Sequence, residues 1–263
     1  MSLILLTNDD GIGSPGLLAL KQAMEKAGEV VVLAPDHNWS AGGHTLTLHK
    51  PLRITETRLA DGSFALATNG GPADCVALAV LGILPHRPDL IVAGINPGAN
   101  VAQDMTYSGT VAAAMEGLIS GIPAIAVSLA IQEGSRKDFT CAARFAAELA
   151  RKVLESGRKD LLLNVNVPDA PCEQISGVEI TRLGRRIYND VLVEREDPRG
   201  RKYYWIGGEP PTGVMEDGTD IAAIAANRIS ITPLQLDLTA YNLLSELRGW
   251  ELRIESILEM HPG

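Results

Sequence analysis

The chain has 263 residues, of which 46% are hydrophobic and 21% are charged, and its formal net charge at pH 7 is -9. This length and composition suit one large α/β unit, since a single hydrophobic core grows to roughly 250 to 300 residues. They exclude a disordered or fibrous chain. The acidic balance excludes a nucleic-acid duplex as an expected partner, because that binding needs clustered Lys and Arg. An anionic ligand would therefore need a local attraction, such as a metal ion or a helix N-terminus.

The cysteines and the apolar runs give expectations about location. The first apolar run is too short for a signal peptide and no later run approaches a membrane span, so we expect no membrane partner. Cys75, Cys141 and Cys172 lie far apart and form no Cys-x-x-Cys pair. This pattern favours reduced thiols and a cytoplasmic location over a disulfide framework. Cys75 and Cys141 fall in apolar helical patterns, which predicts that both lie in the core.

The first two thirds of the chain alternate apolar runs with helical patterns. Strands are expected at residues 3–7, 29–34, 90–94, 124–129 and 161–167, and helices at 15–27, 73–81, 108–120 and 139–154. Runs rich in Leu, Ile and Val without alternation are typical of parallel strands covered on both faces. The pattern predicts an α/β fold with a Rossmann-like, doubly wound, mainly parallel sheet in three layers.

Two parts of the chain depart from this alternation, one within residues 45–67 and the other after residue 168. Residues 45–48, 52–57 and 64–67 read as antiparallel strands at one edge of the sheet, with Asp61-Gly62 as a hairpin turn. After residue 168, strands are expected at 178–183, 191–194, 202–206 and 228–232, a helical turn at 219–225, and a helix with a short strand within 238–258.

The pattern of the C-terminal third predicts a hairpin that projects from a single domain. Residues 191–194 and 202–206 face each other across the turn residues 197–200. The aromatic cluster at 203–205 fits packing within this hairpin or contact with another subunit. Because no linker rich in Gly, Ser or Pro divides the chain, we expect one domain over residues 1–263. Its core would span about 1–170 and its C-terminal hairpin and helix elaboration about 171–263.

Polar side chains follow three of the expected strands at the point where each strand ends. Asp9 and Asp10 follow the first strand, Ser40 follows the second, and Asn96 follows the strand at 90–94. Ligands of open parallel sheets bind beyond these strand ends. Adjacent carboxylates repel unless a cation compensates them, and hard oxygen donors suit Mg²⁺, Mn²⁺ or Ca²⁺ better than Zn²⁺. The alternative for this acidic pair is a simple turn with a helix cap.

The expected helix at 108–120 begins with small, hydrogen-bonding residues. Ser108, Gly109 and Thr110 would present free backbone N–H groups and two hydroxyls to an anion at the positive end of the helix dipole. The alternative is that Ser108 is only the N-cap of this helix. Together with the acidic pair, the helix start predicts a site for a metal ion and a phosphate.

Several segments closely resemble the SurE family of survival proteins, which are 5'-nucleotidases. The resemblance rests on residues 6–12, 94–100 and 107–117, and continues in the family's order through 72–75, 203–208, 218–220 and 229–234. It implies that Asp9, Asp10, Ser40 and Asn96 hold one divalent metal ion. It also implies a homodimer or homotetramer in which C-terminal elements reach a neighbour. The departures are Gly71, where the family usually has threonine, and Ala93, where it often has serine; neither is one of the four metal ligands.

The activity that the resemblance implies is hydrolysis of nucleoside monophosphates to nucleoside and phosphate. Water activated by the metal ion would attack phosphorus, with Asp10 as a possible base and residues 108–110 stabilising charge. The rivals are a receiver-like signalling domain and a non-catalytic nucleotide-binding protein. A receiver needs a phosphoacceptor aspartate after its third strand, which residues 51–57 lack. Base preference, 5' against 3' phosphate, polyphosphate activity and the physiological metal stay open.

Overall fold

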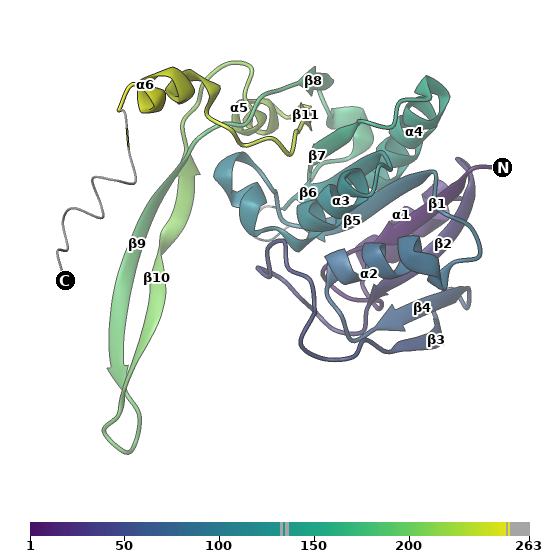
Figure 1. Cartoon of the computed structure of the whole chain (residues 1–263), viewed down its shortest axis with the longest axis horizontal. Helices are drawn as coiled ribbons and strands as arrows, with labels where there is room; N and C mark the ends of the chain where they lie inside the picture. Colours follow the sequence, from purple (N-terminus) through teal and green to yellow (C-terminus); the bar gives the residue numbers. More distant parts are fainter. Residues whose placement is uncertain (132–133, 135–136, 251, 253–263) are drawn as a thin grey trace.

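A mostly parallel β-sheet forms the centre of the computed structural model, which describes residues 1–263 except 132–133, 135–136, 251 and 253–263. The nine strands have the order β3-β4-β2-β1-β5-β6-β7-β11-β8 (Figure 1). From β2 to β7 the neighbours are parallel and buried. The central strands are β1 (Leu3–Thr7), β2 (Glu29–Pro35), β5 (Leu90–Pro97), β6 (Ala124–Ala130) and β7 (Leu162–Pro168).

Helices cover both faces of this sheet. The apolar sides of α1 (Pro15–Met24) and α4 (Thr140–Ser156) share one hydrophobic cluster with the sheet. Those of α2 (Pro72–Leu78) and α3 (Gly109–Ile119) share the other. The predicted doubly wound, three-layer α/β fold is confirmed. The strand order reverses between β1 and β5, so the loops after these two strands open the crevice where such sheets bind ligands.

Both edges of the sheet depart from the parallel pattern. At one edge β3 (Ile54–Arg58) and β4 (Phe64–Thr68) form the predicted antiparallel hairpin. At the other edge β11 (Ile229–Pro233) runs antiparallel to β7, and β8 (Val178–Ile180) lies outside it. Residues far beyond 170 therefore belong to the central sheet. The single domain with a core boundary near residue 170 stays a prediction.

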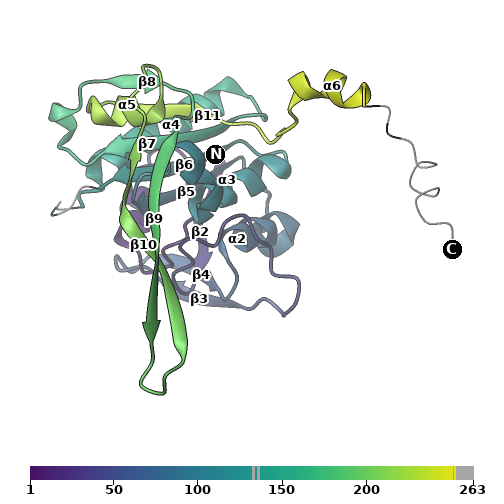
Figure 2. The same ribbon diagram turned by 90° about the vertical axis from the view of Figure 1, so that its left-hand side faces the viewer.

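A two-stranded hairpin projects from the body of the molecule, as both views show (Figures 1 and 2). It consists of β9 (Arg186–Glu196) and β10 (Lys202–Gly213), and both strands are longer than the sequence predicted. The predicted turn is confirmed: Asp197 Oδ1 accepts the N–H groups of Arg199 and Arg201 at 2.8 and 3.0 Å. A carboxylate at the first turn residue thus closes the tip.

The remaining elements are short. They are a π-helix (Ala79–Ile83) that continues α2, 3-10 helices at Ala102–Tyr107, Cys172–Gln174 and Tyr241–Leu243, α5 (Asp220–Ala225) and α6 (Leu244–Arg248). Among the helices that the structure describes, none is long and apolar enough to cross a membrane.

Three predicted strands need correction. Residues 45–48 form no strand, because the N–H and hydroxyl of Thr47 bond to the Asp74 carboxylate at 2.8 and 2.7 Å instead of to a neighbouring strand. The strand expected at 178–183 ends at Ile180. The short strand expected within 238–258 is absent from residues 238–250 and 252; the rest of that range lies outside the described residues.

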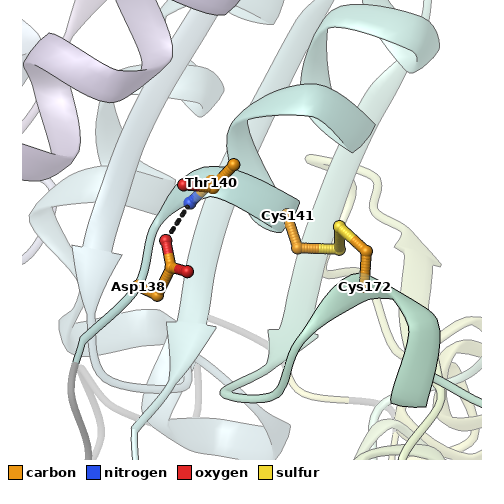
Figure 3. Close-up of a disulfide and its surroundings, with 4 residues drawn as sticks. All are labelled: Asp138, Thr140, Cys141 and Cys172. Atoms are coloured by element: carbon orange, nitrogen blue, oxygen red, sulfur yellow. Dashed lines mark hydrogen bonds between the residues drawn. A yellow bond between two sulfur atoms is a disulfide. The ribbon is translucent and has the colours of Figure 1, made fainter.

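A disulfide between Cys141 and Cys172 corrects the expectation of three reduced thiols (Figure 3). It joins the first turn of α4 to the 3-10 helix after β7. Cys141 is half-buried where these two elements meet and does not lie in the core. Their Cα atoms lie 5.3 Å apart although 31 residues separate them in sequence, so their proximity depends on the fold. Cys75 is fully buried as predicted, and burial raises the pKa of its thiol.

The disulfide gives a direct prediction about thiol counts. Alkylation of denatured protein without reductant should modify one thiol, since two of the three cysteines are paired. With reductant it should modify three. Cys172→Ser should lower the free energy of unfolding by about 2 to 4 kcal/mol in the absence of reductant, because the unfolded chain loses a cross-link. Mass spectrometry that finds three modified thiols without reductant would contradict the pairing.

Candidate metal and phosphate site

The loop after β1 is a compact turn that fixes the acidic pair. The Asn8 side chain closes it, accepting the Gly11 N–H at 3.2 Å and donating to the Gly11 carbonyl oxygen at 3.0 Å. Gly11 has a φ of +98°, and a Cβ atom there would lie 3.1 Å from the backbone of His37. A side chain at residue 11 would strain the turn. The turn that the sequence left as an alternative is therefore present, and it presents Asp9 and Asp10 at the crevice.

Asp9 is buried and held from two sides. Its Oδ1 atom accepts a hydrogen bond from the Thr110 hydroxyl at 2.5 Å, and its carbonyl oxygen accepts the Trp39 N–H at 2.7 Å. The start of α3 packs so closely here that a Cβ atom on Gly109 would lie 2.7 Å from Asp9 Cβ. Glycine at this position lets the helix N-terminus approach the carboxylate.

Asp10 carries a carboxylate with one oxygen that accepts no hydrogen bond among the described residues. This oxygen, Oδ2, is buried. Desolvation, followed by the charge of Asp9, raises the pKa of Asp10 from 3.8 to about 6, while the charge of Lys137 opposes that rise. A buried oxygen without a partner is costly unless something binds it. Two such carboxylates side by side fit a divalent cation.

The other two proposed ligands lie near this acidic pair. A cavity of about 290 Å³ has Asp9, Ser40 and Asn96 in its wall. The Asn96 side-chain amide donates to the Gly98 carbonyl oxygen at 2.8 Å, which orients that side chain. Asp10 lines the adjoining cavity, and Pro97 lies in the walls of both. The structure thus brings the four residues to one crevice, although no single cavity wall contains them all.

The chemistry of these donors decides which metals fit. Two carboxylates, a hydroxyl and an amide are hard oxygen ligands, as Mg²⁺, Mn²⁺ and Ca²⁺ prefer. The part of the chain that the structure describes contains no group of three or more His, Cys, Asp or Glu side chains placed to hold a metal ion. A zinc-type ligand cluster is therefore absent from it.

The hydroxyls of the predicted phosphate cradle have structural partners. Ser108 Oγ accepts the Val111 N–H at 3.2 Å, so Ser108 is the N-cap of α3, which the sequence offered as the alternative. The Thr110 hydroxyl is occupied by Asp9 and is fully buried. What remains for an anion are the backbone N–H groups of Gly109 and Thr110, which as first-turn groups have no acceptor within the helix. A phosphate contact at this turn stays a prediction.

A buried amide network supports the loop that follows Asn96 at the end of β5, and sequence reasoning missed it. Asn100 donates through Nδ2 to Ser128 Oγ and through its backbone N–H to Asn166 Oδ1, both at 2.8 Å. Its carbonyl oxygen accepts from Asn164 Nδ2 at 2.8 Å. These bonds tie the loop after β5 to β6 and β7. Two asparagines within the apolar run of β7 were the available signal, since buried amides need partners.

The raised pKa of Asp10 predicts a conflict between stability and metal binding. Its folded value lies above the 3.8 of an ordinary aspartate, so metal-free protein loses stability as pH rises from about 4 to above 6. At pH 7.5, Asp10→Asn should raise the free energy of unfolding of metal-free protein by about 1 to 2 kcal/mol, which allows for partial solvent exposure. At pH 4 the gain should vanish. Thermal unfolding at both pH values measures it, and an equal effect at each would contradict this account.

Comparisons with known proteins identify the family of this chain. The family model described as "Survival protein SurE" matches residues 4–190. The protein named 5'-nucleotidase SurE of Herpetosiphon aurantiacus is 56% identical over 245 residues, covering 93% of this chain and 96% of that one. Its namesake in Geobacter sulfurreducens is 52% identical, covering 95% and 94%. The crystal structure of the SurE protein from Aquifex aeolicus has a TM-score of 0.80 at 40% identity, covering 95% and 100%. This chain belongs to the SurE family.

Proposed function

We propose that this chain is a divalent-metal-dependent phosphatase that hydrolyses nucleoside monophosphates to nucleoside and phosphate. The observation that supports it most directly is the buried Oδ2 atom of Asp10, which accepts no hydrogen bond from the described residues and lies beside the carboxylate of Asp9. Such a pair suits a cation that in turn attracts an anionic substrate, and this local charge offsets the net charge of -9. Relatives at 56% and 53% identity bear the name 5'-nucleotidase.

Asp9, Asp10, Ser40 and Asn96 are the residues that would hold the ion, with Mg²⁺ or Mn²⁺ as the proposed cofactor. When bound, a divalent ion supplies Lewis acidity to the phosphate oxygens and to a water molecule. The chain itself provides rigid support, because the Thr110 hydroxyl and the Trp39 N–H fix Asp9. A ligand set held this firmly needs little rearrangement when substrate enters.

The remaining steps fall to groups of the chain. The N–H groups of Gly109 and Thr110, with the dipole of α3, would receive the phosphate oxygens, and the cap at Ser108 keeps that turn in place. Asp10 is the proposed acceptor of the proton from the attacking water. A non-catalytic nucleotide-binding protein is the second candidate, since the same loops would bind without turnover.

Phosphate release tests this proposal. Metal-stripped protein should be inactive on 5'- and 3'-nucleoside monophosphates and regain turnover with Mg²⁺ or Mn²⁺. Asp9→Asn and Asn96→Ala should lower kcat/KM by about 100-fold or more, because each removes a ligand atom. Asp160→Asn is the matched control, since this exposed carboxylate precedes β7 at the opposite end of the strands. Metal-dependent affinity without any phosphate release would favour the binding protein instead.

We also propose that the protein is a homodimer or homotetramer assembled through its hairpin. The side chains of Tyr204, Trp205, Ile206 and Leu192 are 53%, 65%, 82% and 68% exposed. Ile206 pairs with Leu192 and shares a face of the hairpin with Tyr204, while Trp205 lies on the other face. Exposed apolar side chains gathered in this way mark an interaction site on most proteins. Replacing both Trp205 and Ile206 with Glu should shift the sedimentation coefficient toward that of a single chain. An unchanged coefficient would contradict assembly through this surface.

The cytoplasm stays the proposed location. The cysteine argument for it no longer holds, since Cys141 and Cys172 are paired and such bonds are typical of oxidising compartments. Cell fractionation followed by thiol alkylation under denaturing conditions tests the location and the pairing together.

A further inference from the structure

The 3-10 helix Ala102–Tyr107 forms a wall of the cavity that contains Asp9. Asp104 and Tyr107 line that cavity together with Ser40 and Asn96. The wall runs directly into Ser108, the N-cap of α3. The position of this 3-10 helix therefore determines how much room the cavity leaves, beside the proposed metal ligands, for the organic group of a phosphate ester.

Side chains at the base of the hairpin hold this wall by an ion pair and hydrogen bonds. Arg186 Nε donates to Asp104 Oδ2 at 2.8 Å, and the Tyr188 hydroxyl donates to Asp104 Oδ1. The Arg186 N–H also donates to Gln103 Oε1 at 2.9 Å. We call Asp104, Arg186 and Tyr188 the clamp. It occupies both carboxylate oxygens of Asp104, so this side chain is held in one orientation.

A second contact fixes the first residue of the wall. Asp220, fully buried at the start of α5, accepts the Ala102 N–H at 2.7 Å and the Gly184 N–H at 2.8 Å. Residues from the last third of the chain thus hold the first half of a cavity wall that lies 80 or more residues earlier in sequence. Residues that form a binding surface are typically held in this way by hydrogen bonds from the residues behind them.

The charge and shape of the wall suit the organic part of a phosphate ester. The positive charge of Arg186 compensates that of Asp104, so the wall does not repel an anionic substrate. The hydrogen bond to Asp104 raises the pKa of Tyr188 to about 12. The ring of Tyr107 is 65% exposed beside the cavity, as an aromatic surface that stacks on a flat ring would be.

We propose that Tyr107 contacts the nucleoside part of the substrate and that the clamp is the positioning device for this contact. The inference rests on the proposed phosphatase activity and extends it, because it assigns the preference for nucleotides over simpler esters to one wall. Phosphate binds at the acidic pair and the start of α3, and the nucleoside lies toward residues 102–107. The hairpin acts on the site through Arg186 and Tyr188 without touching the substrate.

Two substrates measured on the same variants test the contact. Tyr107→Ala should lower kcat/KM for adenosine monophosphate about tenfold, mainly through KM, because base stacking is lost. Hydrolysis of glycerol 2-phosphate, which has no ring to stack, should change less than about twofold. Tyr107→Phe keeps the ring and should restore the wild-type ratio. Equal losses on both substrates, or no loss on either, would overturn the proposal.

The clamp is tested by removing the hydroxyl of Tyr188 and, separately, the negative charge of Asp104. Tyr188→Phe and Asp104→Asn should show the same selective loss for the nucleotide with folding intact by circular dichroism. Tyr241→Phe is the matched control, because this exposed tyrosine also donates to an aspartate, Asp237, and lies outside both the hairpin and the cavity wall. Clamp variants with an unchanged substrate ratio would show that the wall does not depend on the hairpin.

A further measurement separates this inference from the proposed activity. Absence of phosphate release by wild-type protein on both esters would refute the phosphatase activity itself. Calorimetric binding of adenosine monophosphate to wild type and Tyr107→Ala still tests the contact in that case. Weaker binding by the variant supports the nucleoside wall, and equal binding refutes it.

Discussion

The repulsion between two adjacent carboxylates at a strand end is the constraint around which this molecule is arranged. Asp9 and Asp10 lie at the switch point of the sheet. Asp9 accepts a hydrogen bond from a hydroxyl, and Asp10 has a buried oxygen with no hydrogen-bond partner in the part of the chain that the structure describes. Holding them there costs stability, since burial and the neighbouring charge disfavour the ionised form of Asp10. A divalent cation relieves this cost, so we regard the strain as the source of metal affinity.

Much of the surrounding structure keeps this pair in place. Gly11 permits the turn that presents it, and Gly109 permits the close approach of α3. Thr110 bonds to Asp9 while its helix turn offers backbone N–H groups to an anion. A single helix start can thus orient a metal ligand and receive a phosphate. Under the proposed function, this dual use would let a chain of net charge -9 bind an anionic ester.

The parts that sequence reasoning predicted well depend on local patterns. Apolar runs identified the parallel strands, and the polar residues after them identified a crevice that topology then assembled. The ligand identities came from the resemblance to a family. Residues 45–48 were misread because Thr47 bonds to the distant Asp74, which no local pattern reveals. The Cys141–Cys172 pair, the amides around Asn100 and the clamp on Asp104 share that non-local character.

Calorimetric titration of Mn²⁺ into metal-stripped protein tests the central claim most directly. The account predicts one ion bound per chain, with affinity reduced at least about 100-fold by Asp10→Asn even though that variant folds more stably. Binding that is absent from the wild-type protein, or equally strong in the variant, would contradict the claim that the adjacent carboxylates of Asp9 and Asp10 are the metal site.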